Sequence, residues 1–141
     1  MASFTPGWEA LPEALHDFWT ERHLLTLTTL RPDGLPHTVP VGVALDPEQE
    51  CAWVISSGGS RKVRNLLAAG IEGGPVTACQ VDGRRWSTIE GTAVVHHDPA
   101  AVARACERYA GRYRQPRPNP DRVALRIDVR RFLAGRDLLP D

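Results

Sequence analysis

Turn-forming sequences cut this chain into short segments, and their spacing constrains the fold more than any other feature. Residues 31–34, 46–48 and 82–83 read Arg-Pro-Asp-Gly, Asp-Pro-Glu and Asp-Gly, and each separates two runs rich in alternating or β-branched apolar residues. Turns of this kind between such runs predict β-hairpins. Glycine at position 91, inside one long run, predicts a bulge or a close backbone approach. The expected strands are residues 23–30, 36–45, 51–56, 76–81, 85–96 and 122–129, and a last strand reaching Leu138 is considered as well.

Three short helices are expected beside these strands. Apolar residues recur at three- and four-residue steps through 9–21, with Pro12 near the start, which predicts an amphipathic N-terminal helix. A second helix ends near Gly70, and a third opens at Asp98-Pro99 and runs to about Tyr113. The pattern therefore predicts a mainly β protein with short helices, a single domain over 1–141 that forms a six-stranded antiparallel barrel.

Charge and cysteine content narrow the class of protein. The 17 basic and 17 acidic side chains cancel, which removes the broad positive field that nucleic acids or anionic membranes attract. Cys51, Cys79 and Cys106 are odd in number and show no C-x-x-C pairing, so neither a disulfide framework nor a thiolate zinc site is favoured. No secretory leader or bilayer-length apolar run is visible. We expect a soluble, cytoplasmic protein without nucleic-acid or membrane partners.

Residues 56–65, Ser-Ser-Gly-Gly-Ser-Arg-Lys-Val-Arg-Asn, carry the strongest chemical signal. Three hydroxyls and two glycines precede an expected helix start, where free N–H groups favour an anion. Arg61, Lys62 and Arg64 oppose the helix dipole there, which makes best sense if a phosphate binds. Lys62 is also the one lysine among the 17 basic residues. The alternative is a solvated basic face after a serine N-cap.

Other chemistries are disfavoured by the sequence. Neither a Walker loop nor a G-x-G-x-x-G fingerprint after a strand is present. His96 and His97 are adjacent, so on a strand they point to opposite faces and no metal site is expected. No serine sits in a nucleophile elbow, which argues against a hydrolase.

Six ordered blocks resemble one family. They are E-R-H-L-x-x-L-T-T-L-R at 21–31, P-H-x-V-x-V-G at 36–42, G-G-S-x-K-x-x-N at 58–65, Q-V-D-G-x-R-W at 80–86, E-G at 90–91 and R-Y-x-x-R-Y-R-x-P-R-P-N-P at 108–120. Together they resemble the F420-dependent biliverdin reductases, in the B branch of the flavin/deazaflavin oxidoreductases. The sequence departs from the family pattern in two places: the stretch 69–75 is longer, and Pro40 stands where a smaller residue is usual.

The resemblance implies a pyridoxamine 5'-phosphate oxidase-like (FMN-binding) split β-barrel, a homodimer that binds reduced coenzyme F420 in a groove between subunits. The second strand would run beside the deazaflavin ring, and the serine-rich loop would hold the ribityl phosphate and the head of the lactyl-glutamyl tail. The implied ring-side residues are His37, Thr38, Val39, Pro40 and Val41, with Gln80 and Trp86 reached across the dimer. The implied phosphate-side residues are Ser56, Ser57, Gly58, Ser60, Arg61, Lys62 and Asn65.

The same resemblance implies hydride transfer from C5 of the deazaflavin to a planar acceptor held about 3 to 3.5 Å away. Biliverdin would accept the hydride at its central methine bridge. Arg114 and Arg117 are candidate partners for its propionates, although exposed arginines are more often surface ion pairs. No catalytic acid or base is assigned. Two alternatives stay open: an FMN-dependent oxidoreductase on the same barrel, and a carrier that binds F420 or flavin without turnover.

Overall fold

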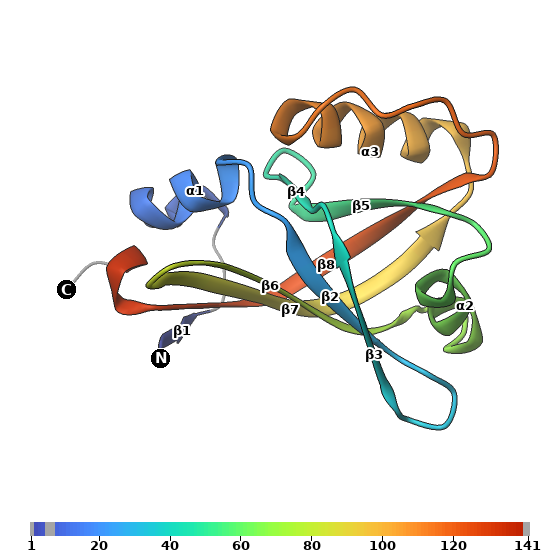
Figure 1. The fold of residues 1–141 in the computed structure, drawn as a ribbon, viewed down its shortest axis with the longest axis horizontal. Coiled ribbons are helices and arrows are strands. Elements are labelled where there is room, and N and C mark those ends of the chain that lie inside the picture. The colour runs from blue at the N-terminus through green and yellow to red at the C-terminus, as the bar shows by residue number, and fades with distance from the viewer. Residues whose placement is uncertain (1, 5–7, 140–141) are drawn as a thin grey trace.

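The computed structural model describes residues 2–4 and 8–139, and they form one antiparallel sheet with helices at its edges (Figure 1). Seven strands follow the order β3-β2-β6-β7-β8-β5-β4, and the three-residue β1 (Ala2–Phe4) pairs with β8. The mainly β, antiparallel split-barrel class is confirmed, but with seven strands on this path where the sequence predicts six. Their bounds are β2 Leu25–Leu30, β3 Pro36–Val41, β4 Ala44–Asp46, β5 Cys51–Ser57, β6 Gly74–Asp82, β7 Arg85–His96 and β8 Arg122–Ala134.

The extra strand arises because the run predicted at 36–45 is broken. β3 pairs with β2, whereas β4 pairs with β5, so the chain changes partner at Gly42 and Val43. A Cβ on Gly42 would lie 2.9 Å from ring carbons of both Tyr109 and Tyr113. The tyrosine hydroxyl of Tyr113 also accepts the N–H of Val43 at 3.0 Å. The corner is therefore set by a helix about 70 residues further along the chain.

The C-terminal prediction also needs correction. Residues 122–129 belong to a strand that runs on to Ala134, and the segment expected as a last strand ends instead in a 3-10 turn, Arg136–Leu138. The long strand absorbs a bulge between Glu90 and Gly91 of β7, where a Cβ on Gly91 would collide with the carbonyl of Asp128. The predicted bulge or close approach at this glycine is confirmed.

The helices are short, as the sequence predicts, but the first is shorter than 9–21. A 3-10 turn (Trp8–Ala10) precedes α1, which spans Glu13–Thr20 with Pro12 at its N-cap. Proline disfavours helical backbone in the residue before it, which separates the two pieces. α2 spans Arg61–Ala68 and α3 spans Pro99–Arg112, where Asp98 accepts the N–H of Ala101 as the predicted cap.

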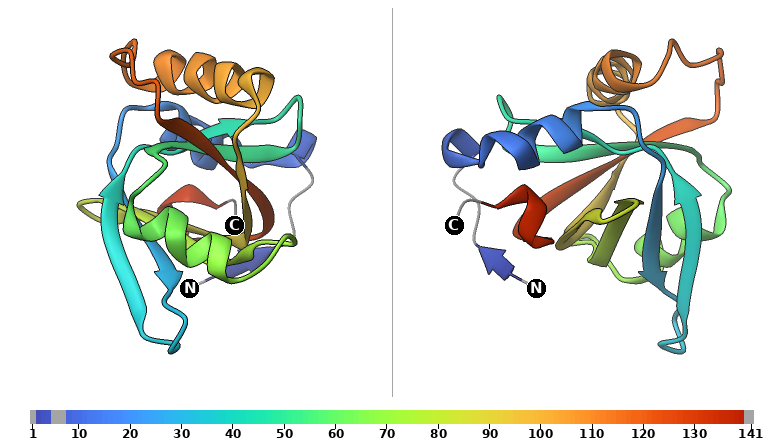
Figure 2. Two further views of the ribbon diagram at one scale, coloured as in Figure 1. Left: turned by 90° about the vertical axis from the view of Figure 1, so that its right-hand side faces the viewer. Right: turned by 60° about the vertical axis from the view of Figure 1, so that its left-hand side comes forward.

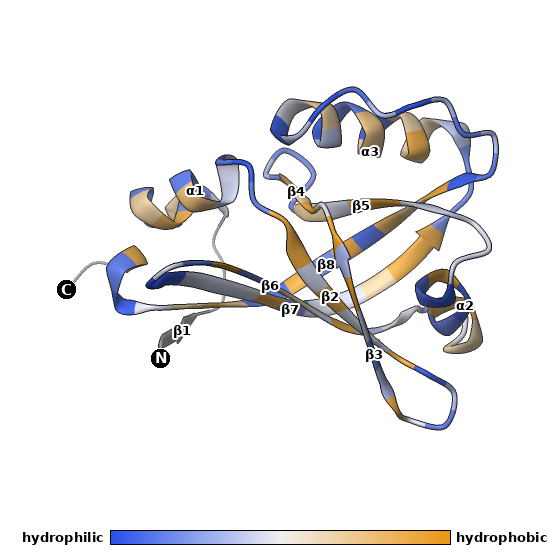
Figure 3. Cartoon of the chain, viewed as in Figure 1, coloured by the Kyte–Doolittle hydropathy of each residue, from blue (hydrophilic) through white to orange (hydrophobic). Residues whose placement is uncertain are grey.

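The sheet is strongly twisted, and its inner face carries the main apolar core (Figures 1 and 2). α3 covers β4 and β5 from outside, α1 lies at one end near the C-terminal turn, and α2 lies at the other end against β2 and β7. Hydrophilic residues dominate the loop after α3 (Figure 3). No helix in the described part of the chain combines the length and apolar character needed to cross a bilayer.

Candidate functional site

The junction of β5 and α2 brings together all seven predicted phosphate-side residues. The hydroxyl oxygens of Ser56 and Ser60 lie 2.9 Å apart. Ser60 occupies the N-cap of α2, yet its side chain accepts no backbone N–H. The first-turn N–H groups therefore have no side-chain acceptor from the cap. We call this cluster the cradle; it consists of Ser56, Ser57, Gly58, Ser60, Arg61, Lys62 and Asn65.

A neighbouring turn fixes the backbone of the cradle. The N–H of Gly58 donates to the carbonyl of Asp121 at 2.8 Å, and a Cβ on this glycine would lie 3.1 Å from an Asp121 carboxylate oxygen. The side-chain amide of Asn119 donates to the Ser57 hydroxyl at 3.0 Å. The sequence reasoning gave Asn119 and Asp121 no role. The only available signal was that Asn119 falls inside the proline-rich block at 108–120.

The three cations at the start of α2 lack counter-charges. The side chains of Arg61, Lys62 and Arg64 form no hydrogen bond or ion pair with the residues the structure describes, and the first turn holds no acidic residue. Lys62 is half-buried, and this burial lowers the pKa of its ammonium group. Cations at a helix N-terminus are unfavourable on their own. The arrangement is therefore suited to an anion.

Unpartnered polar atoms extend the cradle toward β3. Asn65 is 3% exposed and donates to the Thr29 hydroxyl at 3.0 Å, but its Oδ1 has no hydrogen-bond partner in the part of the chain that the structure describes. His37 lies directly opposite Thr29 in the β2–β3 register, and its buried Nδ1 is unpartnered too. Side chains opposite each other share a face of the sheet. The structure thus brings the start of the predicted ring-side strand beside the predicted phosphate site, and both carry unused hydrogen-bonding atoms.

β3 forms an edge of the sheet, as a strand that presents its backbone to a ligand must. Its only partner on the path is β2. Along it Thr38 and Pro40 are exposed, His37 and Val39 are half-buried, and Val41 is buried. One side of the strand thus packs inward, while its free edge and outer face stay open.

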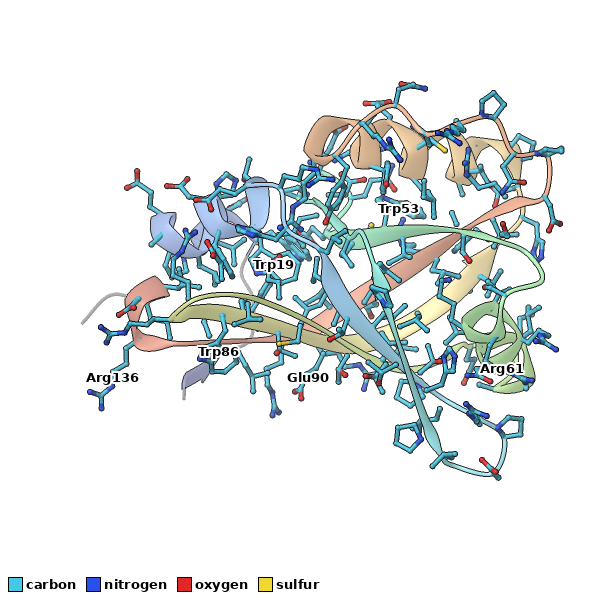
Figure 4. The ribbon with its side chains drawn as sticks, viewed as in Figure 1. Trp19, Trp53, Arg61, Trp86, Glu90 and Arg136 are labelled. Atoms are coloured by element: carbon cyan, nitrogen blue, oxygen red, sulfur yellow. The ribbon has the colours of Figure 1, made fainter. Side chains whose placement is uncertain are left out.

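Gln80 and Trp86 are not brought to the cradle within one chain. Gln80 is 1% exposed; its amide donates to the carbonyl of Phe18 at 3.3 Å and accepts from Arg112 at 2.7 Å. Within this chain the side chain is buried and already hydrogen-bonded, so it is not exposed to a ligand. Trp86 lies at the end of the barrel away from Arg61 (Figure 4), so its predicted place beside the ring depends on a second subunit.

The two predicted substrate arginines lie in the loop after α3. Arg114 and Arg117 are exposed, and their side chains have no partner in the described residues. The backbone carbonyl of Arg117 accepts from the Arg122 guanidinium at 2.7 Å. The loop is thereby anchored, and through Asn119 it also touches the cradle.

The donor set fits a phosphate-bearing organic cofactor. Unpaired cations, serine hydroxyls and helix N–H groups match phosphate oxygens. Within residues 2–4 and 8–139, no three His, Cys, Asp or Glu side chains gather closely enough to hold a metal ion.

Comparison with known proteins agrees with this geometry. Residues 11–134 match the family described as pyridoxamine 5'-phosphate oxidase. The chain belongs to this family. It is 48% identical over 122 residues, 86% of each chain, to an F420H(2)-dependent biliverdin reductase of Mycobacterium tuberculosis (strain CDC 1551 / Oshkosh).

Solved structures show the same fold. A conserved hypothetical protein of Mycobacterium tuberculosis superimposes with a TM-score of 0.73 at 26% identity, over 98% of this chain and 94% of that one. A structure titled F420 reductase gives a TM-score of 0.66 at 23% identity, over 87% of this chain and 98% of that one. Family membership thus accounts for the split barrel on which the cradle sits.

Proposed function

We propose that this protein is an oxidoreductase that uses reduced coenzyme F420 to transfer a hydride to a conjugated acceptor, and that the acceptor is biliverdin. The relative at 48% identity carries that activity in its name. The observation that carries the proposal is the cradle itself, where the cations of Arg61, Lys62 and Arg64 and the buried Asn65 amide oxygen have no partner among the described residues. A phosphate-bearing cofactor would supply partners for these groups.

When bound, F420H(2) supplies the hydride, so the protein needs no acid–base triad. Lys62 and Arg61 would hold the phosphate charge, and the α2 N–H groups would add donors to it. The hydroxyls of Ser56 and Ser60 would complete the phosphate contacts. Arg114 and Arg117, on the loop anchored beside the cradle, would bind the two propionates of the acceptor.

β3 would orient the ring. Its free backbone edge runs from His37 beside Asn65 toward the buried Val41. Hydrogen bonds from an edge strand fix a planar ligand along one direction, and apolar Val39 and Val41 help exclude water from the reacting face. His37 Nδ1, which has no partner within residues 2–4 and 8–139, would form a hydrogen bond with the ligand.

We further propose that the functional unit is a homodimer. On β2, β3 and β6, the outward-facing alternate positions are all uncharged, although 24% of the chain is charged. The outward residues are Thr26, Thr28, Leu30, Pro36, Thr38, Pro40, Pro75, Thr77, Cys79 and Val81. Val81 is 67% exposed and Leu30 is 42% exposed. A charge-free sheet face of this kind favours a second protein copy, which would bring the partner's Trp86 toward the groove.

The dimer is tested at the centre of that face. Thr28 lies opposite both Thr38 and Thr77 in the strand register. Thr28→Glu should convert the dimer to a monomer in light scattering and abolish F420 turnover, while Thr20→Glu, on α1, should do neither. A wild-type protein that is monomeric at micromolar concentration would refute the dimer.

A cytoplasmic location completes the proposal. Its support is that Cys51, Cys79 and Cys106 are all free thiols in the structure, which is typical of a reducing compartment.

The function is tested by mixing the protein with reduced F420 and biliverdin. Recovery of the oxidised deazaflavin absorbance, matched by bilirubin formation, is the expected result. Purified protein that carries FMN and fails to bind F420 would identify the FMN-dependent alternative. Saturable F420 binding without oxidation of the reduced form by any of a panel of acceptors would identify a carrier.

A further inference from the structure

A second concave site lies away from the cradle, between α1, α3 and β4. It is a cleft of about 340 Å³. All the residues that line it are outside the cradle, and α1 and α2 lie at opposite ends of the sheet (Figure 1). Its walls include Trp19, Leu45, Pro47, Glu107, Arg108 and Gly111. The proposed reaction gives this cleft no role.

Arg108 is the cation that the cleft offers to a ligand. The side chain is half-buried, and its Nε and Nη2 both donate to the carbonyl of Leu45, at 3.1 and 2.8 Å. Its Nη1 has no hydrogen-bond partner, and the guanidinium has no counter-charge, among residues 2–4 and 8–139. A guanidinium held along one edge keeps its remaining N–H donors in fixed positions, which is the arrangement that binds a carboxylate well.

The other charges on the walls do not neutralise Arg108. Among the lining residues Glu107 is the one carboxylate, and its Oε1 lies 3.8 Å from Nη1 of Arg104. Arg112 is a second guanidinium, and it donates to the uncharged carbonyls of the backbone and to a side-chain amide. The His16 side chain is 54% exposed, so solvent screens any charge that it carries. The walls therefore favour an anion.

Gly111 keeps one wall of the cleft open. It lies in the last turn of α3, where glycine is less favourable than alanine. Its φ is outside the left-handed region, so the backbone does not require glycine here. A Cβ on Gly111 would meet no atom within 4 Å, so close packing does not require glycine either. What the missing side chain provides is space in the cleft.

The apolar walls define the rest of the ligand. Ligand sites of about 300 to 1,000 Å³ combine apolar walls with a few fixed polar groups, and this cleft is at the small end of that range. Trp19, Leu45 and Pro47 supply the apolar part. An aromatic ring suits such walls, because it packs on tryptophan and proline and loses little conformational freedom when it binds.

We propose that this cleft is a second ligand site, which binds a small aromatic carboxylate. The carboxylate pairs with the free donors of Arg108, and the ring packs against Trp19, Leu45 and Pro47 in the space left by Gly111. The inference goes beyond the proposed function and does not depend on it. Because α1, β4 and α3 all supply walls, the bound ligand ties these three elements together and stabilises the folded chain.

The test is a titration of the full chain, labelled with ¹⁵N, with 1-naphthoate. Saturable NMR shifts are expected at the Gly111 N–H and at the Trp19 indole N–H, which donates to Ser87. The N–H groups of Gly58 and Lys62 in the cradle should not move. 1-Naphthalenemethanol has the same rings without the charge, and it should bind about tenfold to a hundredfold more weakly, the range for a lost charge-assisted hydrogen bond.

Two variants separate the charge from the space. Arg108→Met should weaken 1-naphthoate binding to the level of 1-naphthalenemethanol and leave binding of the alcohol unchanged. Gly111→Leu should fill the cleft and abolish binding of both compounds. Because it leaves Arg108 in place, it tests the site even if Arg108→Met fails to fold. The matched control is Ala103→Leu, at an exposed position of α3 that does not line the cleft, and it should bind like the wild type.

Each other outcome overturns a defined part of the proposal. Equal affinity for the acid and the alcohol would remove Arg108 from the site. Unchanged binding by Gly111→Leu, or the absence of saturable shifts at Gly111 and Trp19, would refute the cleft as the site. Displacement of bound 1-naphthoate by biliverdin would assign the cleft to the acceptor of the proposed reaction and refute a separate ligand. None of these results depends on whether the protein turns over F420.

Discussion

The buried polar groups at the end of α3 are hydrogen-bonded, whereas several of those around α2 are not. At the end of α3, Arg112 is 8% exposed and donates to the carbonyls of Val43 at 2.6 Å and Glu21 at 2.8 Å, and to Gln80 Oε1 at 2.7 Å. Its guanidinium also lies 5.3 Å from the centre of the Trp19 ring. Around α2, by contrast, Arg31, Lys62 and Asn65 keep unused polar atoms.

This contrast separates structural from binding roles. Satisfied buried groups stabilise one conformation, and Arg112 with Tyr113 holds both the N–H and the carbonyl of Val43 at the corner where β3 ends. Unsatisfied buried groups lower stability unless something binds. The fold thus places a rigid corner at one end of β3 and an incomplete polar site at the other.

Stability should fall most when the hydrogen-bonded guanidinium at the end of α3 is removed. Arg112→Met would leave the carbonyls of Val43, Glu21 and Phe18 and the Gln80 oxygen without this donor. We expect the free energy of unfolding to fall by about 3 to 5 kcal/mol, as for other broken buried polar networks. Denaturant titration measures it. Arg61→Met makes the same change at an arginine without hydrogen-bond partners among the described residues, and its free energy of unfolding should stay within about 0.5 kcal/mol of the wild-type value. Comparable losses in both variants would contradict the contrast between the two regions.

At the unsatisfied end, ligand affinity should change instead of stability. Lys62→Ala should weaken F420 binding by about 1.5 to 3 kcal/mol, the value of a charge-assisted hydrogen bond, and leave unfolding nearly unchanged. Because burial lowers the pKa of Lys62, wild-type affinity should fall at alkaline pH as this ammonium loses its proton, and the variant should lack that fall. Titrations across pH measure both. Unaltered affinity in Lys62→Ala would exclude this side chain from the site.

The network under α3 should also show in acid. Burial alone would raise the pKa of Asp46, but hydrogen bonds from Arg104, Trp53 and the Gln49 N–H hold it at about 2, below the ordinary 3.8. A lowered folded-state pKa stabilises the fold above pH 3.8 and loses that contribution as pH falls toward 2. The contribution is about 2 kcal/mol. The free energy of unfolding should therefore decrease more steeply from about pH 5 to pH 2 in the wild type than in Asp46→Asn. Equal pH dependence of this free energy in both proteins would contradict the lowered pKa of Asp46.

Local chemistry made the fold class and the cradle predictable. The bulge at Gly91 and the cap at Asp98 depend on one or two residues, and the cradle is encoded within ten consecutive positions. The break after β3 was not predictable, because Gly42 is shaped by Tyr109 and Tyr113 from a distant helix.

Other features of the site could not be predicted from local sequence because they depend on tertiary contacts. The Gln80 amide hydrogen-bonds to Arg112 and to the carbonyl of Phe18, contacts that no local pattern reveals, and its place beside a ring across a dimer stays a prediction. Conversely, Arg31 and Asn119 become candidates for the site only through the residues that pack against them in the folded chain. A pattern shows which side chains carry chemistry, whereas packing determines which of them are already satisfied.

At Ser60, a single substitution should change stability and ligand binding in opposite directions. Ser60 is the N-cap of α2 but does not cap it. Ser60→Asp would supply an acceptor for the first-turn N–H groups and a counter-charge for the neighbouring cations. Stability should rise by about 0.5 to 1 kcal/mol while F420 affinity falls, because the carboxylate takes the place of the phosphate. Ser57→Asp, three residues before the N-cap, should give no gain in stability. A variant that gained stability and kept full affinity would show that the anion binds elsewhere.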